Sequence, residues 1–169
     1  ERIHYGVEAG TDKILKTLNK GITIEQVKKA FSFTKKYGIS TLAYFMIGSP
    51  SETREDILKT IDFARLLAPD YVHITITTPY PATKMYQDAL LEGVIDRDYW
   101  REFAKYPEKG VKVRYWEKEL KKEELFELLK LFYKKFYTRP DYLIKSLFKI
   151  RSFGELYRKG KAGLKVFKA

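Results

Sequence analysis

The sequence predicts an α/β fold with a parallel sheet, followed by a basic helical region. Three short apolar segments alternate with longer amphipathic ones over the first 93 residues, which is typical of strands and helices. Each connection is long enough for a helical crossover, so the strands should run parallel. Residues 1–108 contain 15 Lys and Arg and 15 Asp and Glu, whereas residues 109–169 contain 18 and 7. The net charge of +11 therefore lies in the last third, and we divide the chain into regions 1–106 and 107–169.

The elements of the first region follow from apolar periodicity and from capping residues. The expected strands are residues 3–8, 40–47 and 71–77, and the expected helices are 12–19, 23–37, 52–67 and 83–91. Thr23 is a typical N-cap and Gly38 a typical helix stop. The buried stripe of the helix between them is predicted to contain Val27, Ala30, Phe31 and Tyr37.

The second region should be mostly helical. We expect a short helix at 98–105 and an extended segment at 111–116. An amphipathic helix at 123–137 should bury Leu125, Leu128, Leu129, Phe132 and Phe136, and it should break at Arg139-Pro140. Two basic helical stretches follow, at 142–150 and from 153 onward.

Three parallel strands make an unusually small sheet, because both faces of a parallel sheet are normally covered. We therefore interpret the chain as the later part of a larger α/β domain whose earlier strands are missing. The first strand should then present an open edge. That edge is expected to pair with the missing N-terminal half or with a second copy of the chain.

The composition narrows the classes of function. The chain has no cysteine, so it can form neither a disulfide nor a thiolate metal site, and no metal ligands are assigned in it. No apolar run reaches the roughly 20 residues that span a membrane, and no signal peptide is evident, so we expect a cytoplasmic protein, with peripheral membrane contact as an alternative. Its richness in Lys and Glu favours a thermophilic source.

The ends of the three strands carry the residues best suited to a ligand. They read 6–10 (Gly-Val-Glu-Ala-Gly), 47–52 (Ile-Gly-Ser-Pro-Ser-Glu) and 77–81 (Thr-Thr-Pro-Tyr-Pro). Carboxyl ends of parallel strands lie at one edge of a sheet, where α/β proteins bind ligands. A carboxylate can accept both hydroxyls of a ribose, while free backbone groups can pair with an adenine edge. The set is suited to a nucleoside, although a Gly before a helix is more often only a cap.

These segments resemble the second half of the radical S-adenosylmethionine (SAM) core, in the branch that includes Elongator and the methylthiotransferases. There the corresponding stretches read close to Gly-Ile-Glu-Ser-Gly, Lys-Gly, Gly-Leu-Pro-Gly-Glu-Thr and Thr-Pro-Tyr-Pro-Gly-Thr. In this chain they are residues 6–10, 20–21, 48–53 and 78–83, in the same order, although Ser51 and Ala82 replace two glycines. The resemblance spans residues 3–93.

The resemblance implies that residues 3–93 are strands four to six of a partial (β/α)6 barrel similar to a TIM barrel. It implies that Glu8 meets the SAM ribose, that Lys20 meets the SAM carboxylate, and that the backbone at Ile47-Gly48 and Pro79-Tyr80 flanks the adenine. Gly6, Gly10, Pro50 and Glu52 complete the expected cofactor-binding set, with Glu52 equally interpretable as a helix-starting acid. No catalytic residue is assigned.

The resemblance also implies cofactors that this chain cannot hold alone. The family binds a [4Fe–4S] cluster with a three-cysteine loop after its first strand, which is absent here. The full-length protein is expected to generate a 5′-deoxyadenosyl radical or to transfer a methyl group through cobalamin, whereas this chain alone should be inactive. Residues 136–140 (Phe-Tyr-Thr-Arg-Pro) resemble the cobalamin-binding branch.

The substrate and the role of the basic region stay open. His4 and His73 should face the barrel lumen, where a small-molecule or lipid-like substrate would bind, although histidines in strands are more often structural. Tyr44 and Met46 could line the same cavity, but residues of this kind more often pack in the core. The basic helices of region 107–169 are most simply a solvated face. The alternatives are a binding module for RNA or for an anionic membrane surface.

Overall fold

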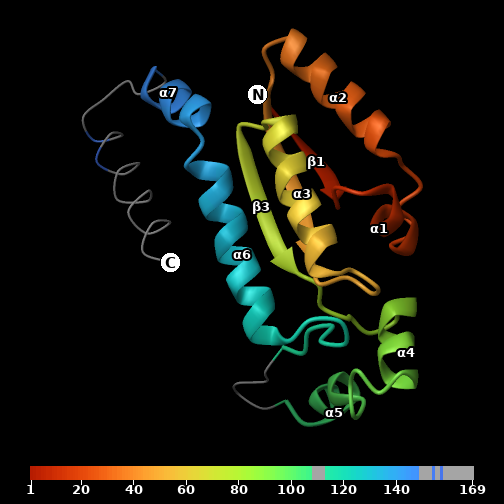
Figure 1. The fold of residues 1–169 in the computed structure, drawn as a ribbon. Coiled ribbons are helices and arrows are strands. Elements are labelled where there is room, and N and C mark those ends of the chain that lie inside the picture. Colours follow the sequence, from red (N-terminus) through yellow and green to blue (C-terminus); the bar gives the residue numbers. More distant parts are fainter. Residues whose placement is uncertain (108–112, 149–153, 155–156, 158–169) are drawn as a thin grey trace.

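The computed structural model describes residues 1–107 and 113–148, together with Gly154 and Tyr157 (Figure 1). Within this part the chain is α/β, with three parallel strands in the order β1-β2-β3. The predicted alternation of strands and helices is therefore confirmed. The elements are β1 (Arg2–Glu8), α1 (Asp12–Thr17), α2 (Ile24–Lys36), β2 (Ser40–Ile47), α3 (Arg54–Leu67), β3 (Tyr71–Ile76), α4 (Lys84–Leu91), α5 (Tyr99–Lys105), α6 (Lys122–Tyr137) and α7 (Pro140–Phe148).

Threonine N-caps fix where the helices of the first region begin. The Thr11 hydroxyl accepts the Ile14 amide, and Thr23 and Thr53 form capping boxes with the residues three positions later. The predicted cap at Thr23 is confirmed. The helix expected from residue 52 begins instead at Arg54, because Thr53 takes the cap position and leaves Glu52 in the preceding turn.

The predicted buried stripe of α2 is wrong at Tyr37. This residue is the C-cap of α2 and is 71% exposed. It lies past the last full turn, so the helical periodicity no longer determines which way it points. Thr34 takes the inner position instead, where its hydroxyl lies 2.6 Å from the Tyr5 hydroxyl. The stop at Gly38 is confirmed by its left-handed φ of 66°.

The two faces of the sheet differ sharply in burial. One face packs against α2, α3 and α6 in a single apolar core (Figure 1). The residues of this core from the strands include Val7, Ala43, Phe45, Ile47, Val72, Ile74 and Ile76. The opposite face carries His4, Tyr44 and His73, which the described helices leave exposed or half-buried. The predicted side for both histidines is confirmed by this alternation.

Helix α6 lies beside β3 and closes the free edge of that strand (Figure 1). The Tyr137 hydroxyl lies 3.3 Å from both the amide and the carbonyl of Val72, and the Tyr133 hydroxyl lies 3.1 and 3.4 Å from those of Ile74. The two rings are parallel, with centroids 6.2 Å apart. Side-chain hydroxyls thus replace the neighbouring strand that β3 lacks.

The corner between α6 and α7 is fixed by Arg139 and Pro140. The Arg139 guanidinium is buried, lies 4.1 Å above the Phe136 ring and donates to the Arg65 carbonyl at 2.9 Å. Pro140 begins α7, where a missing amide is tolerated. The Phe-Tyr-Thr-Arg-Pro stretch therefore docks α6 and α7 on α3 and β3.

The rest of the second region extends beyond the strand ends. Helices α4 and α5 share a small aromatic core with Trp116. The described part of the extended segment, from Val113 onward, forms no strand, but the Trp116 amide donates to the Thr77 carbonyl at 3.2 Å. The helical stretch expected from residue 153 lies outside the described residues, apart from Gly154 and Tyr157. Within the described part, no helix has the length and apolar character that crossing a membrane requires.

Candidate functional site

At the carboxyl end of β1, Glu8, Lys20 and Gly6 form one cluster. The Lys20 ammonium lies 2.8 Å from the Glu8 carboxylate, and the two side chains are 35% and 18% exposed. Glu8 has a left-handed φ of 67° in a bulge of the β1–β2 ladder. This conformation folds its carboxylate back over Gly6, where a Cβ would lie 2.7 Å from Glu8 Oε1. Gly6 is thus needed to leave room for the ion pair.

Gly10, at the start of the following loop, has a clear packing role. Its amide donates to the Thr60 hydroxyl at 2.9 Å. A Cβ there would lie 2.5 Å from the Thr60 backbone and 2.9 Å from Phe63. The close approach that requires glycine is therefore to α3.

At the carboxyl end of β2, the turn from Gly48 to Glu52 wraps around the Glu52 carboxyl. Glu52 is fully buried, and its Oε2 accepts the Ser49 amide at 2.9 Å. Its other oxygen, Oε1, has no hydrogen-bond partner among the described residues. Burial raises the pKa of Glu52 to about 7, against the opposing effect of the Ser49 and Gly48 amides. Glu52 supports the turn from inside, so it can influence a ligand only through the turn.

The outer side of this turn is held in a left-handed conformation. Ser51 has a φ of 61°, and Ala82, in the turn after β3, has a φ of 63°. These are the two positions at which the motifs of the resemblance have glycine, and the backbone geometry that glycine would favour is present here with other side chains. Pro50, which precedes Ser51 in the first turn, is half-buried.

Two contacts from outside the turn stabilise the Ser51 backbone, and each partner is held in place by a second residue. Glu119 Oε1 accepts the Ser51 amide at 2.9 Å, while Glu119 Oε2 accepts the Trp116 indole N–H at 2.7 Å. On the other side, Lys13 donates to the Ser51 carbonyl at 3.1 Å and pairs with Asp56 at 2.7 Å. Burial alone would raise the pKa of Asp56, but Lys13 and the Thr53 donors outweigh it and hold that pKa below its usual value.

Glu119 and Trp116 are site residues that the sequence analysis missed. Neither lies in a motif, and Glu119 is 68 positions from its partner Ser51. Leu125 of α6 is a third contributor, because a Cβ on Gly48 would lie 2.7 Å from its side chain. The second region thus closes over the turn after β2.

The end of β3 joins the same structure. The Thr77 amide donates to the Ile47 carbonyl at 2.8 Å, and the Ser49 and Thr77 hydroxyls lie 3.1 Å apart. Pro79 is buried, while Tyr80 is 58% exposed. The Ile47 side chain lies in the core, so this residue can offer a ligand only backbone groups.

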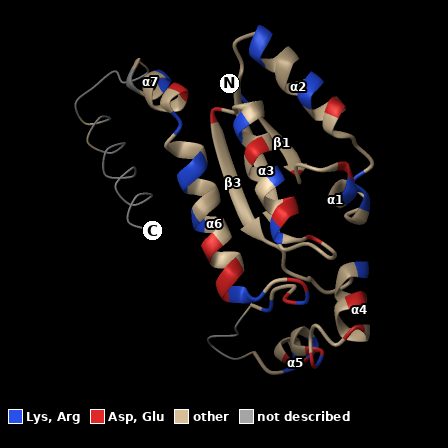
Figure 2. Ribbon diagram, in the orientation of Figure 1, with Lys and Arg blue, Asp and Glu red and all other residues tan. Residues whose placement is uncertain are grey.

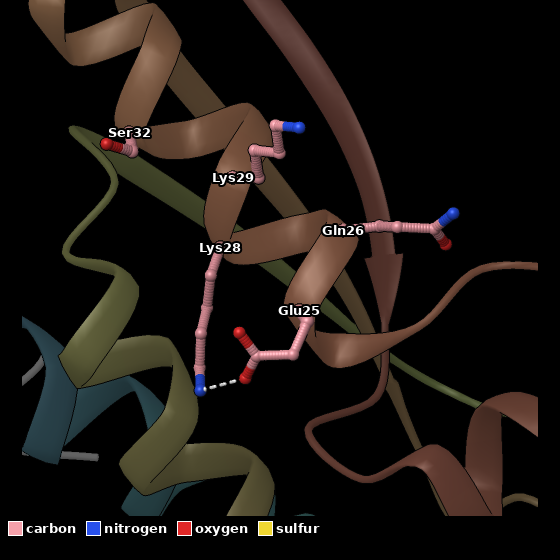
Figure 3. Close-up of a pocket in the computed structure, with 5 residues that line it drawn as sticks. All are labelled: Glu25, Gln26, Lys28, Lys29 and Ser32. Atoms are coloured by element: carbon pink, nitrogen blue, oxygen red, sulfur yellow. Dashed lines mark hydrogen bonds and ion pairs between the residues drawn. The ribbon is translucent and has the colours of Figure 1, made fainter.

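Two hollows in the described part of the chain are lined by residues away from the carboxyl ends of the strands. One, of about 450 Å³, is lined by Glu25, Gln26, Lys28, Lys29 and Ser32 of α2 alone (Figure 3). Figure 3 shows Lys28 directed toward Glu25, and the ion pair measures 2.6 Å. Side chains of one helix do not enclose a site, so we assign this hollow no function.

A second hollow, of about 300 Å³, lies on the open face of the sheet. His73, Tyr44 and Arg2 line part of it, together with Leu42, Tyr71, Val72 and Tyr137. The His4 Nδ1 and the Tyr44 hydroxyl lie 3.1 Å apart, and the Tyr44 and His73 rings meet edge to face at 5.5 Å. His4, Tyr44 and His73 lie on the face of the three-stranded sheet opposite the apolar core.

Comparison with known proteins points to one superfamily. Residues 1–64 match the model of the Radical SAM superfamily. A protein of Pyrococcus horikoshii named as an uncharacterized methyltransferase is 35% identical over 151 residues, covering 89% of this chain and 32% of that protein. That match extends well into the region after residue 106.

Two enzymes match a shorter part of the chain. The anaerobic magnesium-protoporphyrin IX monomethyl ester cyclase of Rubrivivax gelatinosus is 36% identical over 86 residues, which are 51% of this chain and 16% of the enzyme. The tRNA-2-methylthio-N(6)-dimethylallyladenosine synthase of Buchnera aphidicola is 36% identical over 84 residues, 48% of this chain and 19% of that enzyme. The chain spans about a third or less of the length of these relatives. Together, the matches support assignment of this chain to the radical SAM superfamily.

Proposed function

We propose that this chain provides strands four to six of a radical SAM barrel and binds the nucleoside end of SAM. The observation that carries the proposal is the Glu8–Lys20 pair over Gly6, at the same edge of the sheet as the turns after β2 and β3. Glu8 and Lys20 pair with each other but stay partly exposed, so a ligand can reach them. The polar groups of Ser49, Glu52 and Thr77, at the ends of the other two strands, are buried and bond to one another.

In this proposal Glu8 accepts hydrogen bonds from the ribose hydroxyls, and Lys20 binds the SAM carboxylate. Lys20 Nζ can remain beside Glu8 while it meets a second carboxylate, since an ammonium has three donors. The exposed ring of Tyr80 and the backbone of the Gly48 and Pro79 turns flank the adenine. Glu52, Glu119 and Trp116 keep the Gly48–Glu52 turn in place.

The iron–sulfur cluster must be held by a segment outside this chain. The chain has no cysteine, and within the described residues no group of three or more His, Asp or Glu side chains could bind a metal ion. The cluster would supply the electron that cleaves SAM, whereas the residues described above bind and orient the nucleoside. We therefore expect that the isolated chain binds the nucleoside weakly and produces no 5′-deoxyadenosine.

Within the superfamily, we propose that the chain belongs to the cobalamin-linked branch. The Phe-Tyr-Thr-Arg-Pro stretch and the long match to a protein named as a methyltransferase support this assignment. A small-molecule or lipid-like substrate would then bind against the open face of the sheet. His4, Tyr44 and His73 are the side chains placed to contact it.

The binding step can be tested on the chain itself. Uniformly ¹⁵N-labelled protein is titrated with S-adenosylhomocysteine, a stable analogue of SAM, and amide shifts are followed by NMR. We expect shifts at the amides of residues 6–8, 20, 48, 49, 51, 78 and 80. The substitution Glu8→Gln removes a charge-assisted acceptor and should weaken binding about tenfold or more.

A control variant and two contradicting outcomes complete the test of the proposed binding site. Glu25→Gln alters an exposed carboxylate on α2 and should leave binding unchanged. Shifts confined to other surfaces, or equal binding by Glu8→Gln and the unchanged chain, would contradict the proposed site. Formation of 5′-deoxyadenosine by the isolated chain after anaerobic iron and sulfide treatment would contradict the assignment of the cluster to another segment.

A further inference from the structure

Helix α7 exposes an apolar surface that the fold and the proposed cofactor site do not use. Leu143, Ile144 and Phe148 are 44%, 54% and 86% exposed. No other described helix exposes more than one large apolar side chain. The side of α7 that faces the protein packs against α6. The centroid of the Tyr142 ring lies 5.9 Å from that of Phe136 and 5.1 Å from that of Tyr137.

The three exposed side chains share one side of the helix. At 3.6 residues per turn, positions 143, 144 and 148 fall within an arc of about 140°. Tyr142 lies outside this arc, which is consistent with its contacts on the core. An apolar stripe of this width, set parallel to the surface, is typical of a helix that lies in an interface.

Lysines lie near the apolar surface and outnumber the single acidic residue of α7, Asp141. Lys134 and Lys135 of the preceding helix are exposed, and Lys145 lies within α7 (Figure 2). Figure 2 also shows that the acidic residues of α6 lie at its opposite end. From Lys130 to the last residue the sequence contains twelve Lys and Arg and two acidic residues. The partner of this surface should therefore be both apolar and anionic.

Two other partners fit less well. Single-stranded RNA is bound by stacking successive bases on several exposed rings, but this surface of α7 offers one, Phe148. The neighbouring rings are occupied, because Tyr133 and Tyr137 bond to β3 through their hydroxyls and Phe136 is buried. A stable dimer buries about 800 Å² on each partner, from roughly 20–30 residues a side. Three side chains on a nine-residue helix provide far less.

We propose that α7 docks on an anionic lipid bilayer, with Leu143, Ile144 and Phe148 among the acyl chains and the neighbouring lysines at the headgroup phosphates. The apolar side chains determine the depth and orientation of α7, while the lysines select anionic over zwitterionic lipid. Helix α7 lies at the end of the sheet opposite the carboxyl ends of the strands (Figure 1), so docking leaves those ends accessible. This inference does not depend on the proposed cofactor site.

The absence of cysteine provides a direct test with the whole chain. Ile144→Cys introduces the only thiol, which is labelled with a fluorophore that shifts to the blue in an apolar medium. Vesicles of phosphatidylcholine with roughly one phosphatidylserine in three lipids should produce the shift, and vesicles of phosphatidylcholine alone should not. High salt should weaken binding about tenfold or more.

Matched variants distinguish docking through α7 from nonspecific adsorption of the chain to lipid. Leu91→Cys places the same label on α4, at a residue that is 84% exposed, and should show no shift. The unlabelled double variant Ile144→Ser/Phe148→Ser should pellet with anionic vesicles at least ~tenfold less than the unchanged chain. The variant Leu91→Ser should pellet normally. Unchanged circular dichroism would show that the double variant is folded.

Several outcomes would overturn the proposal. An equal shift from both labels, or equal pelleting by the double variant, would mean that α7 does not insert. Binding to polyuridylate with loss of vesicle binding would identify RNA as the ligand. A label shift that appears without lipid and grows with protein concentration would identify a second copy of the chain as the partner.

Discussion

Glu52 is a buried carboxyl with one oxygen bonded to the turn and one without a partner among the described residues. Desolvation, the largest effect on it, raises its pKa from 4.5 to about 7. The folded chain therefore keeps this proton over a pH range in which the unfolded chain has lost it. The resulting stability is fully present below pH 4.5 and is lost as the pH rises through about 7.

We predict that Glu52→Gln removes this pH dependence. The amide is neutral, and its carbonyl can still accept the Ser49 amide. Between pH 4.5 and 7 the free energy of unfolding of the unchanged chain should fall by up to about 3 kcal/mol relative to that of the variant. Urea unfolding at several pH values measures this difference. Parallel curves for the two proteins would mean that Glu52 is ionised in the folded state throughout.

Gly48 meets two constraints at once, a left-handed φ of 74° and contact with Leu125. We predict that Gly48→Ala costs more than about 2 kcal/mol of unfolding free energy, from backbone strain and from overpacking. Gly21→Ala is the matched control, because Gly21 has a φ of 68° and an added Cβ there would meet nothing within 4 Å. Its cost should be about 1–2 kcal/mol. Equal costs in thermal or urea unfolding would show that Leu125 moves aside freely.

At the residue scale, the sequence predicted roles that depend on nearby residues and short motifs. It did not predict contacts between residues that are far apart in the chain. Glu8 and Lys20 were predicted from a resemblance to contact one ligand, and the structure places them in contact with each other. Glu119 could not be predicted, because its role depends on the way the second region folds back on the first. A Glu between Trp116 and Leu120 has no local pattern that distinguishes it from a solvated carboxylate.

The elements that the sequence predicted best are those with both a cap and an apolar period. Helix α2 has its N-cap at Thr23 and its stop at Gly38 where expected, and α6 buries Leu125, Leu128, Phe132 and Phe136. Errors fall at helix ends, as with Tyr37 and the start of α3, where side chains leave the helical period. Nothing in the pattern of α6 predicted that its tyrosines would bond to a strand edge.

We predict that Tyr133→Phe/Tyr137→Phe exposes the β3 edge without removing the aromatic packing. Each hydroxyl bonds to both backbone groups of one residue of β3, so its loss should cost about 1 kcal/mol. Hydrogen exchange at the Val72 and Ile74 amides should accelerate. Tyr37→Phe, which alters an exposed ring, should change neither quantity. Unaltered exchange at both amides in the double variant would mean that α6 covers the edge by bulk alone.

The whole molecule has a sheet with two unlike edges. The β3 edge is closed by α6, whereas within the described part of the chain β1 pairs with β2 alone. Open edges of parallel strands favour pairing with further strands. Growth of the sheet is therefore directed to the β1 side, which is the side on which the earlier strands of the proposed barrel would lie.

We predict that the isolated chain self-associates through β1. Light scattering over a series of concentrations should give a mass that rises above 19.9 kDa. Ile3→Lys adds a charge to the open strand at a residue that is 37% exposed, so it should shift the mass toward the monomer. Leu91→Lys adds the same charge on α4 and should leave association unchanged. If the unchanged chain stays monomeric at every concentration, the β1 edge is protected by the protein itself. Association that persists in Ile3→Lys but disappears in Ile144→Ser/Phe148→Ser would instead place the contact on α7.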